Sequence, residues 1–579
     1  MRWGSFAGAV LAVAAAVLVL SLEPIRAPWW NWADPDGAYV GSSLNILFGN
    51  HTNYLDHPGL PTQDVLALGF GTDYLVGKAT GKFDNRQAYV DQQMLDLDRA
   101  RILYRSWAIA LFLGATLLVN FVVTRLLGHW TLGLSGSLVF VSAPELGVIS
   151  FLLRPDAVLA ALCLAVGYLM VPAFERRSAL RYTGAAALLG LAMTVKLTAV
   201  GMVVPLAVAV VWRTPGPEWF RSLAGTVTAW VRRNALWLVP TSLVWFVLCW
   251  LFNRERLPIV QTDDQRSTLV DGATFLGGYA LLAFATERFR IPWADRIFRL
   301  VYAWLMLAFV VGMAIPASLV LDDGVQMLVA MKETLTGKRV NEGVDPFANF
   351  TTSALTEYPL NAAVVVIGLG AAAGVIGLRR RQHWPFLLGL GSIVLATMAA
   401  ARYSFDYYYV PAFAVAIPGA LWILRRRARP TAPAYVWIGV LALFGWSLTH
   451  VQTWEPRRAA EIDAAAQQLA DELLRPGEVI LVGNYYFPVE DVRFGSLVDG
   501  FVDYVPEYPY RFLSRPRVAG ERGLVPRYVV GGDELPDTGE VANLDIDGYG
   551  PFVVEGLARR WGPAQEFRVA RVVESPSLE

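Results

Sequence analysis

The sequence predicts an all-α bundle of about thirteen membrane-spanning helices, followed by a small α/β domain outside the membrane. Of its 579 residues, 55% are hydrophobic and 17% are charged. The mean hydropathy of +0.42 lies above the range of soluble globular chains. Long apolar stretches recur up to residue 450 and then stop. The 49 basic and 49 acidic residues cancel, so the net charge itself says nothing about nucleic acid, and no nucleic-acid partner is expected.

Each apolar stretch that approaches the roughly 20 residues needed to cross the hydrocarbon layer is a candidate span. These stretches are 4–22, 104–124, 130–148, 157–174, 182–195, 197–212, 235–252, 272–286, 298–320, 359–378, 384–401, 409–424 and 434–450. No small-residue cleavage site follows the first stretch, so we expect an uncleaved helix there and not a signal peptide. The short stretches 182–195 and 272–286 require tilted or re-entrant segments.

The arginines predict the topology, because basic residues near span ends stay on the cytoplasmic side. Under this assignment, Arg125 and five arginine-rich stretches all fall on one face of the membrane. The stretches are 176–181, 213–233, 288–299, 379–381 and 425–429. We therefore expect a multi-pass protein of the bacterial cytoplasmic (inner) membrane, with its N-terminus inside. The membrane domain is residues 1–450, and its first outer loop is 23–103.

The segment 451–579 is predicted to be a soluble extracytoplasmic α/β domain. The stretch "AAEIDAAAQQLADELLRPGEVILVG" has the pattern of an amphipathic helix, a Pro-Gly turn and a buried strand. It contains no GxGxxG motif, so no nucleotide site is expected there.

The opening loop carries the stretch "ADPDGAYVG", which places Asp34 and Asp36 just beyond the first span. A carboxylate stays ionised more readily at the membrane surface than in hydrocarbon. Pro35 and Gly37 predict a turn that leads into a helix over 38–48. The alternative is that both aspartates merely solvate or cap a helix end.

Three further groups of polar residues fall on the same predicted outer face. Glu145, Arg154 and Asp156 bracket a short connection, where Arg154 and Asp156 are alternatively a simple pair at a helix start. Lys196 stands between two apolar runs, and it either snorkels to the interface or meets an anion such as a phosphate. Arg402 lies in a short loop with Tyr407, and its guanidinium suits bidentate phosphate binding.

The motifs "DPDGAY" with "HPGLP" downstream, "LLRPDAVLA", "TVKLTAV" and "RYSFDYYYVPAF" resemble, in their order, the GT-C membrane glycosyltransferases. The branch that they resemble most contains the protein O-mannosyltransferases and the bacterial aminoarabinose and arabinose transferases. The resemblance covers the chain to about residue 425. Two departures stand out: Gly37 follows Asp36, with Asp34 across Pro35, and "HPGLP" has Gly59 where relatives often have a second proline.

The resemblance implies an inverting transfer of one sugar from a polyprenyl-phosphate donor to a glycan, lipid or protein hydroxyl. It implies Asp36 as the general base, favoured over Asp34 by its Asp-x-x-Tyr spacing to Tyr39. Lys196 and Arg402 would hold the phosphate, and Asp156 would bind sugar or acceptor while Arg154 orients a carboxylate. Glu145, Tyr407 and His57 complete the expected substrate-binding set.

Several alternatives stay open at this point. A divalent cation has possible ligands in His51, His57, Asp34, Asp36 and Asp56. Their spacing matches no defined metal motif, so no metal or other cofactor is expected. Competing functions are a transporter or flippase of lipid-linked sugars, an oligosaccharyl transferase that moves a glycan en bloc, and an inactive relative that binds lipid or a partner.

Overall fold

The computed structural model describes residues 11, 14, 36–48, 59–95, 97–141, 155–214, 218–253, 265–274, 277–278, 281, 294–335, 362–400, 409–427, 456–482, 511–513, 516–532, 534–546, 549–561 and 567–576. The chain divides into two compact units. The first contains Met1–Ser21, Leu55–Asp64 and Ala108–Gln452. The second contains Leu22–Tyr54, Val65–Trp107 and Thr453–Glu579. Each is described by itself.

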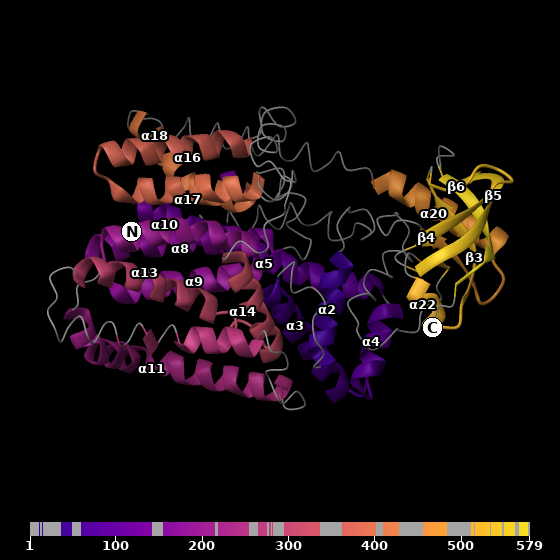
Figure 1. Cartoon of the computed structure of the whole chain (residues 1–579), viewed down its shortest axis with the longest axis horizontal. Helices are drawn as coiled ribbons and strands as arrows, with labels where there is room; N and C mark the ends of the chain where they lie inside the picture. The colour runs from indigo at the N-terminus through magenta and orange to yellow at the C-terminus, as the bar shows by residue number, and fades with distance from the viewer. Residues whose placement is uncertain are drawn as a thin grey trace. The chain divides into compact units, whose positions relative to one another are not determined.

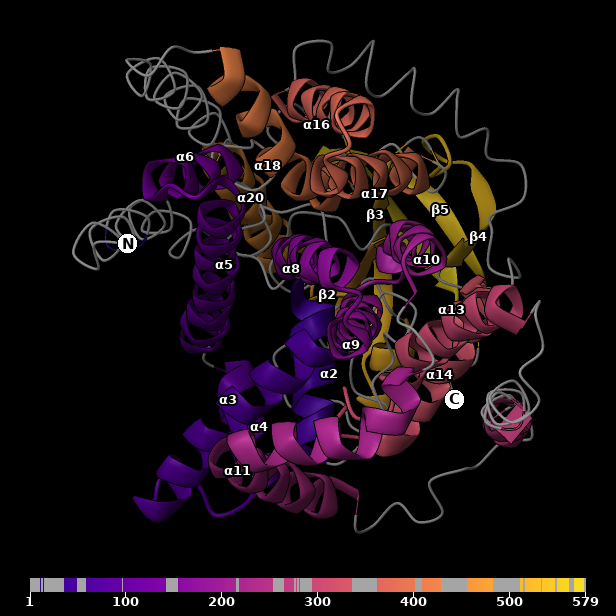
Figure 2. The ribbon, with the colours of Figure 1, turned by 90° about the vertical axis from the view of Figure 1, so that its left-hand side faces the viewer.

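The first unit is a bundle of helices (Figures 1 and 2). Its described helices are the greater part of α5 (Leu97–Leu127), α6 (Trp130–Val141), α8 (Asp156–Arg176), α9 (Ala179–Val195), the 3-10 helix η3 (Leu197–Met202), α10 (Val203–Trp212), α11 (Glu218–Asn253), α13 (Ala294–Gly312), α14 (Leu321–Leu335), α16 (Ala362–Arg379), α17 (His383–Ala400) and α18 (Val410–Arg427). The apolar stretches predicted between residues 104 and 212 and between 359 and 424 lie largely in these helices. The stretch 298–320 is shorter than predicted, because its helix ends at Gly312 and a turn follows.

Two helices in the described part of the chain are long and apolar enough to cross a membrane, Ile102–Leu127 and Asp156–Arg176. Shorter apolar helices follow at Trp130–Val141, Ala179–Val195, Leu197–Trp212, Tyr302–Gly312, Val365–Arg379 and His383–Ala399. Proposed spans 4–22 and 434–450 lie almost wholly outside the described residues. The number of about thirteen crossings therefore remains a prediction.

Helices α16, α17 and α18 pack through glycines. A Cβ added at Gly389 would lie 2.9 Å from the carbonyl oxygen of Gly370 and 2.9 Å from the Cα of Gly374. A Cβ at Gly370 would lie 2.7 Å from that of Ala416 in α18. Small residues let helix backbones approach closely, which is the usual solution where lipid supplies no hydrophobic driving force.

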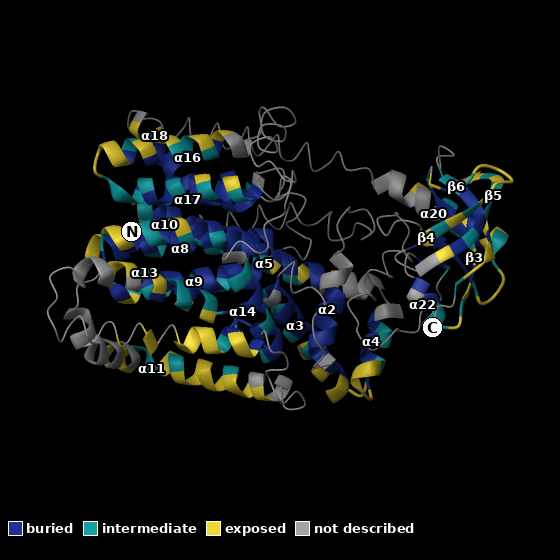
Figure 3. Cartoon of the chain, in the orientation of Figure 1, coloured by how far each residue is buried: buried dark blue, intermediate teal, exposed yellow. Residues whose placement is uncertain are grey.

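The second half of α11 exposes most of its apolar side chains, and its ribbon is largely in the colour of exposed residues in Figure 3. Leu236 is 87% exposed, Trp237 79% and Phe246 68%. In water such a surface would be unfavourable, so this helix suits a hydrocarbon environment, as the sequence predicts for 235–252.

The opening loop is helical where it is described. It forms α2 (Asp36–Phe48), α3 (Leu60–Ala79), α4 (Arg86–Leu95) and the start of α5. The predicted helix over 38–48 is confirmed, but it begins earlier than expected: Asp36 is its first residue, so Gly37 lies inside the helix and not in the turn before it. From Val40 to Leu47 every side chain of α2 is buried.

The C-terminal part of the second unit is mixed α/β, as predicted. Helix α20 (Pro456–Leu473) leads through a turn at Gly477, whose φ is +84°, into the buried strand β1 (Glu478–Val482). The other elements are α22 (Pro516–Glu521) and strands β2 (Phe512–Leu513), β3 (Val525–Gly531), β4 (Val541–Ile546), β5 (Tyr549–Trp561) and β6 (Phe567–Glu574). The sheet order is β2-β1-β3-β6-β5-β4, parallel around β1 and antiparallel from β3 to β4.

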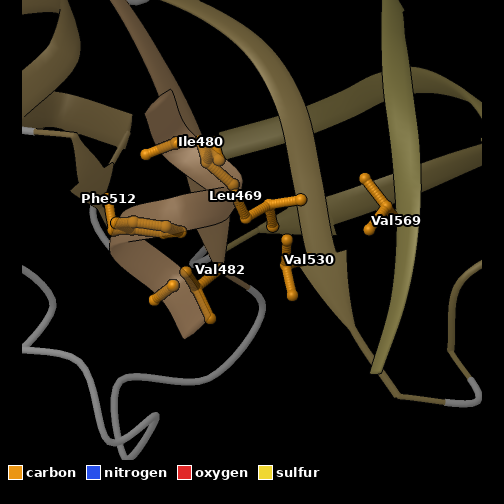
Figure 4. Close-up of a cluster of buried hydrophobic side chains, with 8 residues drawn as sticks. Leu469, Ile480, Val482, Phe512, Val530 and Val569 are labelled. Carbon is orange, nitrogen blue, oxygen red and sulfur yellow. The ribbon is translucent and has the colours of Figure 1, made fainter. Parts of the chain in front are cut away.

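The core of this domain forms between α20 and the sheet (Figure 4). Leu469 of α20 lies among Ile480, Val482, Phe512 and Val530, all at most 2% exposed. The amphipathic pattern of 459–473 is therefore explained by one apolar face against the strands.

Candidate functional site

The α8–α9 hairpin brings two charged residues together that are 40 positions apart. Helix α8 begins at Asp156 and α9 ends at Val195, with a tight turn at Arg177 between them. At 1.5 Å per residue the two helices are roughly 31 and 25 Å long. The start of α8 and the end of α9 thus fall at the same end of the hairpin, and the long side chain of Lys196 spans the small difference in length.

Lys196 and Asp156 form a buried ion pair. The Nζ atom of Lys196 donates to Oδ1 of Asp156 at 2.6 Å, and the two side chains are 7% and 0% exposed. Asp156 stands in the first turn of α8 and Lys196 is the C-terminal cap of α9. Each charge therefore also faces the helix end whose dipole favours it. The ammonium points to an internal carboxylate and not to solvent.

The backbone at Lys196 is fixed by its neighbours. Its φ of −162° is extended, which ends α9, and its N–H donates to the carbonyl of Ala192 at 3.0 Å. Its own carbonyl accepts from Ala199 at 3.0 Å and so starts η3. The backbone on both sides of Lys196 therefore fixes the position from which its side chain reaches Asp156.

A second buried polar group joins the region after "HPGLP" to α14. Oδ2 of Asp64, at the start of α3, accepts a hydrogen bond of 3.1 Å from the N–H of Leu319, two residues before α14. Asp322 and Asp323 in the first turn of α14 are 2% and 1% exposed. Burial raises the pKa of Asp64 well above its usual value, the Leu319 hydrogen bond lowers it in part, and Asp323 raises it further.

The contact between Asp64 and the segment before α14 is linked to the Lys196–Asp156 ion pair through η3. Helix α14 packs against η3, which begins immediately after Lys196. The residues Gly59 to Asp64, α14, η3 and Lys196 therefore form a continuous chain of contacts.

The other predicted site residues are described in part or not at all. Asp36 and Tyr39 are placed in the first turn of α2, where only their backbone is described. Asp34, His57, Glu145, Arg154, Arg402 and Tyr407 lie outside the described residues, as do His51 and Asp56. Within the described ranges no group of three His, Cys, Asp or Glu side chains is close enough to hold a metal.

Four charged residues that are buried in the described part of the chain were not predicted from the sequence: Asp64, Arg105, Asp322 and Asp323. Asp64 interrupts the apolar pattern "LPTQDVLALGF", and Arg105 of α5 is 0% exposed and lies 5.8 Å from the ring of Tyr104. Each of these residues shares its helix with other ionisable residues, so the sequence offered no signal that set it apart.

An apolar helical bundle with a lysine–aspartate pair buried at its helix ends is typical of polytopic membrane proteins, in which charges within the bundle are rare and paired. Residues 102–245 match the family model described as dolichyl-phosphate-mannose-protein mannosyltransferase. The match covers about a quarter of the chain and includes Asp156, Lys196 and both long apolar helices. It confirms, over these residues, the resemblance to the GT-C membrane glycosyltransferases.

A search of curated proteins gave no match to this chain. Among solved structures, ArnT from Cupriavidus metallidurans in the apo state is 14% identical with a TM-score of 0.33, and 98% of each chain is covered. The same protein bound to undecaprenyl phosphate is 14% identical with a TM-score of 0.29, covering 97% of this chain and 98% of the other. These scores are too low for an element-by-element comparison, so nothing about the site follows from them.

Proposed function

We propose that this chain is an inverting membrane glycosyltransferase that moves one sugar from a polyprenyl-phosphate donor to an acceptor hydroxyl. The observation that carries the proposal is the family match over residues 102–245. The matched family is described by a sugar donor on dolichyl phosphate, which is a polyprenyl phosphate. The matched segment also contains the buried cation that such a donor's phosphate requires.

The reaction needs one base. The acceptor oxygen attacks the anomeric carbon while the bond from that carbon to the phosphate oxygen breaks. The electron pair of this bond leaves with the lipid phosphate, and the hydroxyl proton passes to the base. We assign the base to Asp36, with Asp34 as the alternative, because Asp36 stands three residues before Tyr39. A positioned carboxylate base typically contributes about 10² to 10⁴ in rate. A single displacement inverts the anomeric centre.

Lys196 and Arg402 are the proposed phosphate ligands. An ammonium carries three N–H donors, so Lys196 can keep its bond to Asp156 and still donate to a phosphate oxygen. Its positive charge would then be in place before negative charge develops on the leaving group. Arg402 adds the bidentate contact that a guanidinium offers.

The ion pair sharpens the role of Asp156. Its carboxylate contacts Lys196 directly, so we propose that it positions the ammonium, in addition to the contact with sugar or acceptor implied by the resemblance. Arg154, Glu145, Tyr39, Tyr407 and His57 remain the proposed substrate-binding residues. The chemistry would take place at the outer face of the inner membrane, where a lipid-linked sugar is accessible and a nucleotide sugar is not.

The test is a transfer assay with purified protein in lipid nanodiscs and a panel of radiolabelled polyprenyl-phosphate monosaccharides. A mixture of cell-envelope lipids and glycans supplies the acceptor hydroxyls, and release of the lipid phosphate is followed, so the acceptor need not be identified in advance. Asp36→Asn should lower turnover by about 10² to 10⁴, whereas Asp34→Asn serves as the matched control and should retain most of it. An equal loss of turnover in both variants would contradict the assignment of Asp36 as the base. If no donor is turned over and the donor moves between the two leaflets, the protein is a flippase and not a glycosyltransferase.

A further inference from the structure

One end of the bundle gathers arginines and aromatic rings from the ends of several helices. The ring of Phe174 at the end of α8 lies 4.8 Å from that of His383 at the start of α17. Trp212 at the end of α10 lies 5.8 Å from His383 and 5.8 Å from Phe386. We call this region the basic end, defined by residues 125–130, 174–182, 211–214, 378–386 and 422–426.

Arginines are fixed into this surface by contacts between helices. The guanidinium of Arg426 in α18 lies 4.1 Å from the ring of Trp422 and donates to Gln382 at 3.1 Å. Arg425 donates to the carbonyl of Leu127 at the end of α5. Arg213 lies 5.0 Å from the ring of Phe174. The ends of α5, α8, α10 and α18 and the α16–α17 turn are thus joined at one place.

The charge of the basic end is strongly unbalanced. Arg176, Arg177 and the three arginines at 379–381 are exposed. Glu175 is the single carboxylate within the ranges that define the basic end. A surface with this excess attracts anions, and its attraction falls with ionic strength.

Two of these arginines occupy positions that normally belong to glycine. Arg177 has φ +49° and Arg381 has φ +56°, and they are the residues other than glycine with positive φ in the described part of the chain. Both turns close in the same way: Ser178 N–H donates to Ala173 at 3.0 Å, and Gln382 N–H donates to Gly377 at 2.8 Å. This 6→1 bond is that of the Schellman motif, whose left-handed residue is usually glycine because a Cβ is disfavoured there.

A side chain kept in a disfavoured backbone conformation points to a function for that side chain. Exposed apolar residues adjoin the arginines on the same helices: Trp212 is 46% exposed, Leu378 48% and Leu424 44%. A ligand that matches both surfaces must be anionic at one end and apolar at the other. Phosphate alone lacks the apolar part, whereas an anionic phospholipid has both.

We propose that the basic end binds the phosphate headgroups of anionic phospholipids, with Arg177 and Arg381 as its anchoring residues. The tryptophan and phenylalanine rings lie at the headgroup level, as aromatic residues do at membrane interfaces. This binding is separate from the transfer reaction and does not depend on it. Nor does it depend on which leaflet this end faces.

The test uses the full chain in nanodiscs of phosphatidylcholine alone or of phosphatidylcholine and phosphatidylglycerol in equal parts. Thermal midpoints and the retained lipid in native mass spectrometry are measured. The wild type should gain stability from phosphatidylglycerol. Arg177→Gly with Arg381→Gly should lose that gain and bind phosphatidylglycerol about 25-fold more weakly, at roughly fivefold per arginine.

The glycine variant separates lipid binding from damage to the fold. In phosphatidylcholine alone its midpoint should equal or exceed that of the wild type, because glycine relieves the left-handed backbone. Arg560→Gln, an exposed arginine of β5, is the control for a loss of charge elsewhere and should keep the full phosphatidylglycerol effect. A phosphatidylglycerol effect of wild-type size in the double glycine variant would overturn the proposal. The same stabilisation of the wild type by soluble inorganic phosphate would also overturn it.

Discussion

Replacement of Lys196 by methionine should destabilise the bundle by removing the partner of a buried carboxylate. At an effective dielectric constant of about 20, unit charges 2.6 Å apart attract by roughly 6 kcal/mol. Desolvation offsets part of this, and removal of one member of a buried pair typically costs about 3–5 kcal/mol. We expect Lys196→Met to lie in that range, since Asp156 is 0% exposed.

The double variant Asp156→Asn with Lys196→Met tests directly whether the two charges stabilise each other. It removes both charges, so its loss of stability should be smaller than that of Lys196→Met alone, and the coupling energy of the cycle should exceed about 2 kcal/mol. Unfolding in mixed micelles titrated with SDS can be followed by the fluorescence of the 20 tryptophans. Additive losses, with a coupling energy near zero, would refute the reasoning that the two residues act as a buried pair.

Activity adds a second readout to the same cycle. If the ammonium holds the donor phosphate, the double variant should recover stability without recovering transfer. A stable double variant with wild-type turnover would show that the pair serves the fold alone.

Three further predictions concern other parts of the chain. Burial raises the pKa of Asp64 in the folded protein above 3.8, so the wild type should lose stability as the pH rises from about 4 through that folded pKa. Asp64→Asn removes this titration and should flatten the pH dependence of stability. Thermal unfolding at pH 4 to 8 measures this. Gly190→Val should destabilise the bundle by about 1–3 kcal/mol or more, because a Cβ there would lie 2.2 Å from the carbonyl oxygen of Val310; SDS titration measures this. Leu469→Ala should cost the C-terminal domain about 2–5 kcal/mol, because Leu469 is 2% exposed in its core; urea unfolding followed by far-UV circular dichroism measures this.

Each has a matched control. Asp84→Asn changes an exposed carboxylate and should leave the pH profile as it is; a wild-type profile that does not fall with rising pH would contradict the account of Asp64. Gly184→Val lies on the same helix as Gly190, but its added Cβ meets nothing within 4 Å. Val541→Ala changes a side chain that is 63% exposed. Losses as large in these two controls would show that close packing is not the cause.

Local patterns predicted much of the fold. The helix, Pro-Gly turn and strand at 456–482 followed from periodicity and from a turn that needs positive φ at Gly477. The apolar stretch 157–174 became α8 almost residue for residue. The strand order β2-β1-β3-β6-β5-β4 could not be predicted from the sequence, because pairing between strands distant in sequence leaves no local pattern.

The sequence pointed to individual residues of the candidate site, but it did not predict which of them are in contact. Lys196 was identified as a lone charge among apolar residues, and Asp156 as one of a polar group with Arg154 and Glu145. Their pairing depends on the lengths of α8 and α9 together. Asp64 was missed because one carboxyl in a helix has the same appearance in sequence whether it faces water or the N–H of Leu319. The role of Asp36 as base stays a prediction.

The close approach of α16, α17 and α18 restricts how this part of the sequence can vary. With backbone atoms of Gly370 and Gly374 within 3 Å of a Cβ at Gly389, even alanine would require the helices to separate slightly. In homologous chains that keep this packing, we expect these three positions to be occupied almost wholly by glycine, with alanine or serine as rare exceptions. The lipid-facing positions of the same helices, such as Val375 and Ile393, should exchange freely among apolar residues.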